Sequence, residues 1–144
     1  MNRRVIAVAV GGITAAASVS TALALPSRPS AKSGAFDFVA VSTASRDFKG
    51  FTIGGDKDVS NGHVIGTDSL QCVVSKDNSS GNCDVAASFK RGQIYGTFTL
   101  NFKDGSLTGK VNGGTRAFKG AVGTIKGHAV GNNKEKVHLT YQTP

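Results

Sequence analysis

The sequence contains no tryptophan, one methionine, two cysteines and three prolines among its 144 residues. So few prolines exclude a proline-rich disordered chain, and the 19 glycines follow no Gly-X-Y period, which excludes collagen. The length allows one domain and excludes a multidomain enzyme. The composition also excludes a coiled coil and a polytopic membrane protein. Hydrophobic residues make up 39% of the chain, which is enough for a single packed core.

Residues 1–24 have the three parts of a secretory signal peptide. Arg3 and Arg4 give a positive start, residues 5–17 form an uncharged run of apolar and small residues, and the segment from Ala22 to Ala24 is an A-x-A cleavage site. We predict cleavage after Ala24 and a secreted protein without stable membrane insertion. Cleavage removes Arg3 and Arg4 and so lowers the net charge from +8 to +6. Sec and twin-arginine export both stay open, and an uncleaved helix is the alternative.

The mature chain then has two parts. Residues 25–34 include two prolines and several serines, typical of a flexible lead-in, and residues 35–144 form one domain. Cys72 and Cys83 are eleven residues apart, and export favours a disulfide between them over a catalytic thiol. The histidines show no ligand spacing, and we predict neither a metal nor a cofactor.

The mature chain alternates short runs of Val, Ile, Phe and Thr with Gly, Asn and Asp, and it has no helical period. Two-residue turns are expected at Asn61-Gly62, Arg91-Gly92 and Asp104-Gly105, and a three-residue loop at 132–134. Each turn fixes a register that the apolar alternation can test. The predicted partners are Phe89 and Ile94, Val85 and Phe98, Phe102 and Leu107, Phe98 and Val111, Cys72 and Cys83, Leu70 and Val85, Asp68 and Ala87, Val59 and Val64, and Ile125 and Tyr141.

Strands at 35–43 and 51–59 bring the total to about eight. An antiparallel meander of this size, rich in glycine at its bends, is typical of a small closed barrel. We therefore predict an all-β, eight-stranded antiparallel barrel, with a β-sandwich as the alternative.

By strand alternation, Lys57, Asp68 and Tyr141 fall on the apolar face, together with Phe51 and Ile53. These polar groups either reach water at the barrel mouth or form the polar spot of a small-molecule site. In the second case Asp68 acts as base or acceptor, Lys57 as its cation and Tyr141 as a donor. The candidate ligand-lining residues are Leu70, Phe89, Phe98, Phe102 and Tyr141.

Other activities find no support in the sequence. The lysines are scattered and not interleaved with stacking aromatic residues, so we predict no nucleic-acid partner. Gly-x-Ser-x-Gly is absent, and the Gly113-Gly114-Thr115 string is followed by no Gly-Lys-Ser/Thr phosphate loop.

The most specific string runs from Gly113 to Gly123, with the sequence GGTRAFKGAVG. It resembles the G-G-T-x-x-[YF]-x-G-A-x-G signature of the allene oxide cyclase-like and dirigent-like barrel superfamily. The segment from Asn61 to Thr67, with the sequence NGHVIGT, and the two cysteines also resemble small secreted bacterial members of it. Arg116 stands where a glycine is common. The resemblance implies an eight-stranded antiparallel barrel with an apolar cavity.

Characterised members of this superfamily, such as allene oxide cyclases, dirigent proteins and bacterial spirotetronate cyclases, hold a reactive hydrophobic substrate in one folded shape. The resemblance thus implies a cyclase or isomerase that steers ring closure by restricting conformers. The alternatives are a secreted, non-catalytic binder of a small hydrophobic molecule, and a structural, envelope-associated barrel with a filled core that forms homo-oligomers. No catalytic carboxylate of the superfamily can be matched to a residue here.

Overall fold

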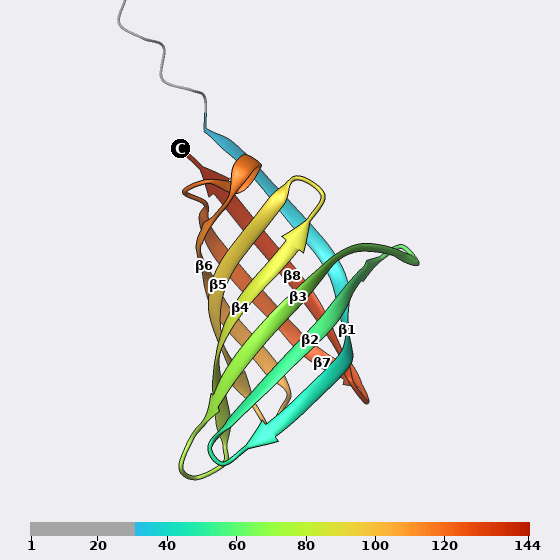
Figure 1. Ribbon diagram of the computed structural model, residues 1–144, viewed down its shortest axis with the longest axis vertical. Helices are drawn as coiled ribbons and strands as arrows, with labels where there is room; N and C mark the ends of the chain where they lie inside the picture. Colours follow the sequence, from blue (N-terminus) through green and yellow to red (C-terminus); the bar gives the residue numbers. More distant parts are fainter. Residues whose placement is uncertain (1–30) are drawn as a thin grey trace, which may run out of the picture.

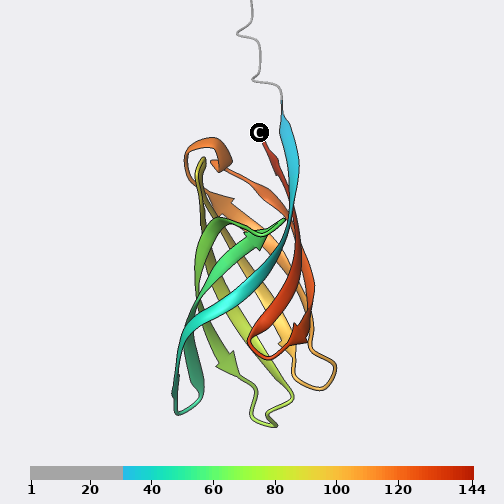
Figure 2. The same ribbon diagram turned by 90° about the vertical axis from the view of Figure 1, so that its right-hand side faces the viewer.

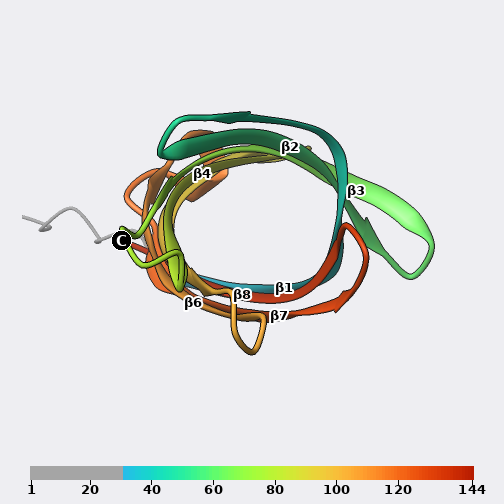
Figure 3. The ribbon, with the colours of Figure 1, turned by 90° about the horizontal axis from the view of Figure 1, so that it is seen from below.

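The computed structural model describes residues 31–144, so the predicted signal peptide and cleavage site lie outside the described residues. Eight antiparallel strands follow one another in chain order, and β1 pairs with both β2 and β8, which closes the barrel (Figure 1, Figure 3). The predicted all-β barrel is confirmed. The elements are β1 (Lys32–Phe48), β2 (Phe51–Ser60), β3 (His63–Val74), β4 (Ser80–Phe89), β5 (Gly92–Asn101), β6 (Ser106–Gly114), the 3-10 helix η1 (Arg116–Phe118), β7 (Val122–Gly131) and β8 (Lys134–Thr143).

Apolar side chains fill the interior because alternate residues of each strand point inward. Gly96 shows how tight this packing is, since a Cβ there would lie 2.6 Å from the Ile125 Cδ1 atom and 2.8 Å from the Lys110 carbonyl oxygen. Only glycine fits at that point of β5. Within residues 31–144, no helix is long and apolar enough to cross a membrane. The buried core residues include Phe38, Ile94, Leu107, Val111, Ile125, Val137 and Leu139.

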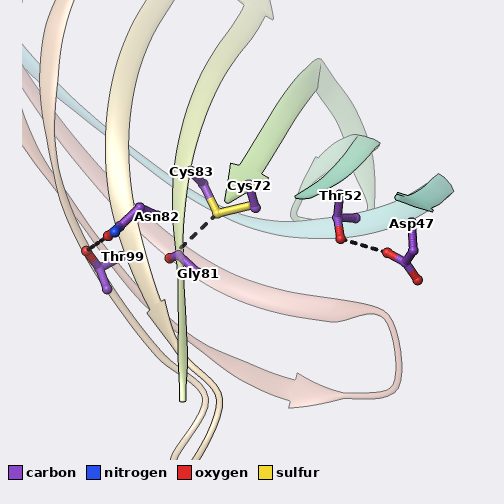
Figure 4. Close-up of a disulfide and its surroundings, with 7 residues drawn as sticks. All are labelled: Asp47, Thr52, Cys72, Gly81, Asn82, Cys83 and Thr99. Atoms are coloured by element: carbon purple, nitrogen blue, oxygen red, sulfur yellow. Dashed lines mark hydrogen bonds between the residues drawn. A yellow bond between two sulfur atoms is a disulfide. The ribbon is translucent and has the colours of Figure 1, made fainter. Parts of the chain in front are cut away.

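The predicted disulfide between Cys72 and Cys83 is confirmed, and it joins directly paired residues of β3 and β4 (Figure 4). The register that it implies is also correct. In the neighbouring hairpin, the predicted pairing of Val59 with Val64 is confirmed as well. The other confirmed partners are Leu70 with Val85 and Asp68 with Ala87.

Three other predicted registers are wrong by two residues. The β4–β5 turn is Lys90-Arg91 instead of Arg91-Gly92, the β5–β6 loop spans residues 102–105, and the β7–β8 turn is Asn132-Asn133. A shift of two residues leaves the same side chains facing inward, so the apolar alternation could not detect it. The observed partners are Phe89 and Gly92, Ala87 and Ile94, Cys83 and Phe98, Leu100 and Leu107, Phe98 and Gly109, and Ile125 and Leu139.

In β2, the predicted inner face is wrong. The register shifts between Asp58 and Val59, so one residue is left over at a β-bulge, and every side chain from Asp58 back to the start of β2 changes sides. Asp56 and Asp58 are consequently buried, whereas Lys57 and Ile53 are exposed on the outer surface.

β1 is longer than its partner β8. Its pairing with β8 ends where Val41 meets Lys134, and from Ser42 to Phe48 it pairs with β2 alone, with a register shift between Ser42 and Ala44. The Ser42 amide donates a last hydrogen bond to the Asn133 carbonyl oxygen at 3.0 Å. The β1–β2 hairpin therefore extends beyond the β7–β8 turn.

Candidate ligand-binding site in the barrel

One end of the barrel is closed by four aromatic rings, which we call the aromatic plug: Phe36, Phe89, Phe118 and Tyr141. The short helix η1 lies at the same end as the C-terminus and carries the fully buried Phe118 (Figure 2). Its ring meets Tyr141 edge-on at 5.1 Å, and Phe36 stacks on Phe89 at 4.3 Å between centroids. Two predicted ligand-lining residues, Phe89 and Tyr141, are thus part of this plug.

The turn that delivers Phe118 begins at Arg116, whose φ of 52° lies in the left-handed region. Glycine adopts this conformation at the least cost, which is consistent with the glycine common at this position of the resembling signature. The GGT string therefore has a structural role here, because it ends β6 and turns the chain back over the barrel end.

Beyond the plug lies a cavity of about 40 Å³ with a mainly apolar wall. Of the predicted ligand-lining residues, Leu70 and Phe98 line it. Phe102 does not, because it lies in the β5–β6 loop with 46% of its surface exposed. The space holds about three water-sized groups, well below the volume of a drug-sized pocket. The remaining lining residues are Phe38, Ala40, Asp56, Asp68, Val85, Ala87, Ile94, Gly96, Leu107, Ile125, Glu135, Val137 and Leu139.

Four acidic side chains gather on the β8–β1–β2–β3 side of the interior, and we call them the carboxyl cluster: Asp56, Asp58, Asp68 and Glu135. Asp56 lies directly opposite Asp68 in the β2–β3 register, and Asp58 and Glu135 both pair with Ala40 of β1, one from each side. Asp58 is fully buried and Asp56 is 6% exposed, whereas Asp68 and Glu135 are half-buried. Three of the four line the cavity.

Burial raises the pKa of every carboxyl group in the cluster. Desolvation, reinforced by the neighbouring charges of Asp56 and Asp58, raises the pKa of Asp68 to about 8, and desolvation together with Asp56 raises that of Asp58 to about 6. Desolvation also raises the pKa values of Asp56 and Glu135. Asp58 and Asp68 are close enough to affect each other's pKa, but both Asp58 oxygens and Oδ1 of Asp68 lack a hydrogen-bond partner of ordinary geometry among the described residues.

No basic side chain of residues 31–144 balances the carboxyl cluster. Every lysine, arginine and histidine in residues 31–144 is exposed, including Lys57, which sequence alternation had placed beside Asp68. Tyr141 lies in the aromatic plug. The structure therefore brings Asp68 together with three other acids instead of with Lys57 and Tyr141.

Sequence reasoning missed Asp56, Asp58 and Glu135 as interior residues. Asp56 and Asp58 are two residues apart on one strand and must share a face, but only the β-bulge decides which face that is. Glu135 comes directly after the loop expected at 132–134, and nothing in the sequence marks it as an interior residue; it is the second residue of β8.

This arrangement can hold and transfer protons. At pH 7, a carboxyl group with a pKa of about 8 is mostly protonated and can donate a hydrogen bond, and one with a pKa of about 6 is mostly ionised and accepts. Two carboxyl groups whose environments separate their pKa values are a common arrangement for general acid–base chemistry. An acidic group beside an apolar wall also suits a ligand with one apolar and one polar end.

The fold is similar to a solved structure of a pyocyanin demethylase, with a TM-score of 0.64 and 20% sequence identity over 75% of this chain and 99% of that one. At this identity the likeness shows a shared small barrel fold. Neither a family model nor a curated protein sequence matches the chain. Membership of the allene oxide cyclase-like superfamily therefore stays a prediction.

Proposed function

We propose that the barrel binds a small, largely hydrophobic molecule in its interior, at the end of the cavity not closed by the aromatic plug. The observation that carries this proposal is the cavity itself, in which an apolar wall and three carboxyl groups face the same space. Sites for small molecules commonly combine an apolar lining with a few convergent polar groups. The similar structure belongs to an enzyme, a pyocyanin demethylase, so a barrel of this kind can support a reaction on a small molecule.

The resting cavity of about 40 Å³ admits only part of such a molecule. Leu70, Val85 and Phe98 are only half-buried, and rotation of these side chains enlarges the space. Binding thus requires the wall to move, while the plug and the disulfide keep the two ends of the barrel in place.

More specifically, we propose that the protein is a cyclase or isomerase. A narrow apolar wall restricts the conformers of a flexible substrate and accelerates ring closure. In an isomerisation, the Asp56 carboxylate, which borders the cavity, accepts a proton from one substrate atom and the protonated Asp68 returns one to another. Transfer of a proton from Asp56 to its cross-strand partner Asp68 then restores the starting state. Lys57 lies on the outer surface and has no part in this step.

The small cavity favours a second candidate, a secreted structural barrel with a filled core. In that case the interior serves stability alone, and the outer face makes the contacts. This candidate predicts that no molecule is retained and that the carboxyl cluster affects stability only.

The test is native mass spectrometry of the mature, disulfide-bonded protein after incubation with an extract of the producing culture. We expect a retained mass of a small apolar molecule, and a change in that mass over time would separate an enzyme from a binder. A protein that retains nothing, and runs as a defined oligomer, would support the structural candidate.

Ala87→Val provides the matched variant, because Ala87 lines the cavity and the added methyl groups occupy it. We expect loss of the retained mass. Ala86→Val is the control, since Ala86 is the next residue of β4 and points to the outer face. Equal retention by both variants would contradict an interior site.

A further inference from the structure

We propose that the polar end of the bound molecule is a compact cation, a protonated amine or amidinium group, held by the carboxyl cluster. This inference rests on the proposed function and specifies the class of ligand. It follows from the charge balance, the unpartnered atoms and the size of the cavity.

The charge balance of the interior is one-sided. The acidic side chains in the interior are Asp56 and Asp58 of β2, Asp68 of β3 and Glu135 of β8. The inward-facing residues of the other strands are apolar, glycine or serine. Buried charges in proteins are normally paired with an opposite charge or bound to a cation. Every basic side chain of residues 31–144 is exposed, so no described residue supplies a counter-charge, and an external cation is the partner that we infer.

Unpartnered atoms point to the same conclusion. Asp58 is fully buried, and neither of its oxygens accepts a hydrogen bond from another described residue; Oδ1 of Asp68 is buried and unpartnered as well. An unsatisfied buried polar group destabilises the folded state. Asp68 lines the cavity, so the N–H groups of a cation there would satisfy its Oδ1 atom with a charge-assisted hydrogen bond.

The size of the cavity limits the cation. A space of about 40 Å³ holds a head group of about three non-hydrogen atoms, such as a primary ammonium with its first carbons or an amidinium. A trimethylammonium group is too large. No group of three metal-ligating side chains in residues 31–144 is arranged to hold a metal ion, so an organic cation with N–H donors is the better match.

Binding of such a cation has a distinctive proton signature. With a pKa of about 8, Asp68 is mostly protonated at pH 7, and a nearby positive charge lowers that pKa. The cation should therefore release up to one proton per binding event. A neutral ligand of the same shape should release none.

The experiment is isothermal titration calorimetry at pH 7 in two buffers of different ionisation enthalpy. The probes are phenethylamine, which is cationic at this pH, 2-phenylethanol, which is neutral, and phenylacetate, which is anionic. We expect phenethylamine to bind at least tenfold more tightly than 2-phenylethanol, with proton release, and phenylacetate to show no binding. Asp56→Asn and Asp68→Asn, at two carboxyl groups that line the cavity, should each weaken phenethylamine binding about tenfold and leave 2-phenylethanol within twofold. Asp84→Asn is the matched control because Asp84 is exposed on the outer face of β4.

The outcomes separate this inference from the proposed function. Equal binding of phenethylamine and 2-phenylethanol, or tighter binding of the alcohol, would overturn the cation and leave a hydrophobic-ligand barrel standing. If none of the three probes binds, the mass retained in native mass spectrometry decides: a molecule with a basic nitrogen supports the cation, and one without it overturns the cation alone. No binding and no retained mass would overturn both.

Discussion

Asp56 and Asp68 are direct cross-strand partners on β2 and β3, and both carboxyl groups border the same cavity. Like charges in directly opposite positions of a sheet repel each other, and burial strengthens that repulsion. The barrel therefore carries a locally unfavourable pair at its most distinctive site. Such conflicts between local chemistry and fold are typical of functional sites.

The carboxyl cluster should make the folded state less stable as the pH rises. The pKa of Asp68 is about 8 in the native protein, so between pH 4 and pH 8 the native protein keeps a proton on Asp68 that the unfolded chain has already lost. Asp58 keeps its proton in the same way up to about pH 6. Since the unfolded state binds fewer protons in this window, stability falls with pH through it. We expect the Tm to drop by several degrees between pH 5 and pH 9 in differential scanning calorimetry. Asp68→Asn should flatten this dependence, and a Tm that rises over the same range would contradict the assignment.

Replacement of the buried Asp58 should stabilise the protein. Asp58→Asn removes an unpartnered carboxylate without changing its shape, and we expect the free energy of unfolding at pH 8 to rise by about 1 kcal/mol or more, with little change at pH 4. Urea denaturation at the two pH values measures this. Asp84→Asn, on the outer face, should stay within about 0.5 kcal/mol of the wild type. A destabilised Asp58→Asn protein at pH 8 would mean that the carboxylate has a partner in solution.

The disulfide should contribute to the free energy of unfolding because it closes a short loop of the chain. Its cysteines are eleven residues apart, so the Cys72→Ala/Cys83→Ala double variant should lose about 3 kcal/mol in the free energy of unfolding. Denaturant titrations with and without reductant provide the comparison. Reductant should lower the stability of the wild type and leave that of the double variant unchanged; a loss below about 1 kcal/mol would show that pairing of β3 with β4 needs no covalent link.

Truncation of a side chain in the aromatic plug should lower the free energy of unfolding far more than truncation of the exposed phenylalanine at the other end of the barrel. Phe118 is fully buried, and Phe118→Ala should cost about 3–5 kcal/mol. Phe102 is 46% exposed, and Phe102→Ala should cost less than about 1 kcal/mol. Equal losses in chemical denaturation would mean that the plug does not close the barrel end in solution.

Sequence patterns were sufficient for the fold because a barrel needs little more than alternation, turns and strand number. The disulfide fixed the β3–β4 register independently of hydrophobicity, and that register is correct. The registers around Arg91-Gly92, Asp104-Gly105 and residues 132–134 were each wrong by two. Alternation has a period of two residues, so it cannot distinguish these registers from the true ones.

The candidate site was harder to predict because it depends on a single extra residue. The bulge beside Val59 reverses the face of β2, which exchanges Lys57 for Asp56 and Asp58 in the interior. No turn residue marks this bulge in the sequence, and the apolar Phe51 and Ile53 favoured the opposite face. Asp68 was placed correctly because β3 takes its register from the disulfide.

The overhang of β1 beyond β8 has a consequence for self-association. Ring closure removes the free strand edges that other chains can pair with, but from Thr43 to Phe48 the side of β1 turned away from β2 has no strand beside it. Arg46, Asp47 and the neighbouring Lys49 are all exposed along this stretch. Charged side chains at such an edge hinder the addition of a foreign strand. Protection against edge-to-edge aggregation along this stretch of β1 therefore depends on its charged residues, because the closure of the barrel does not cover it.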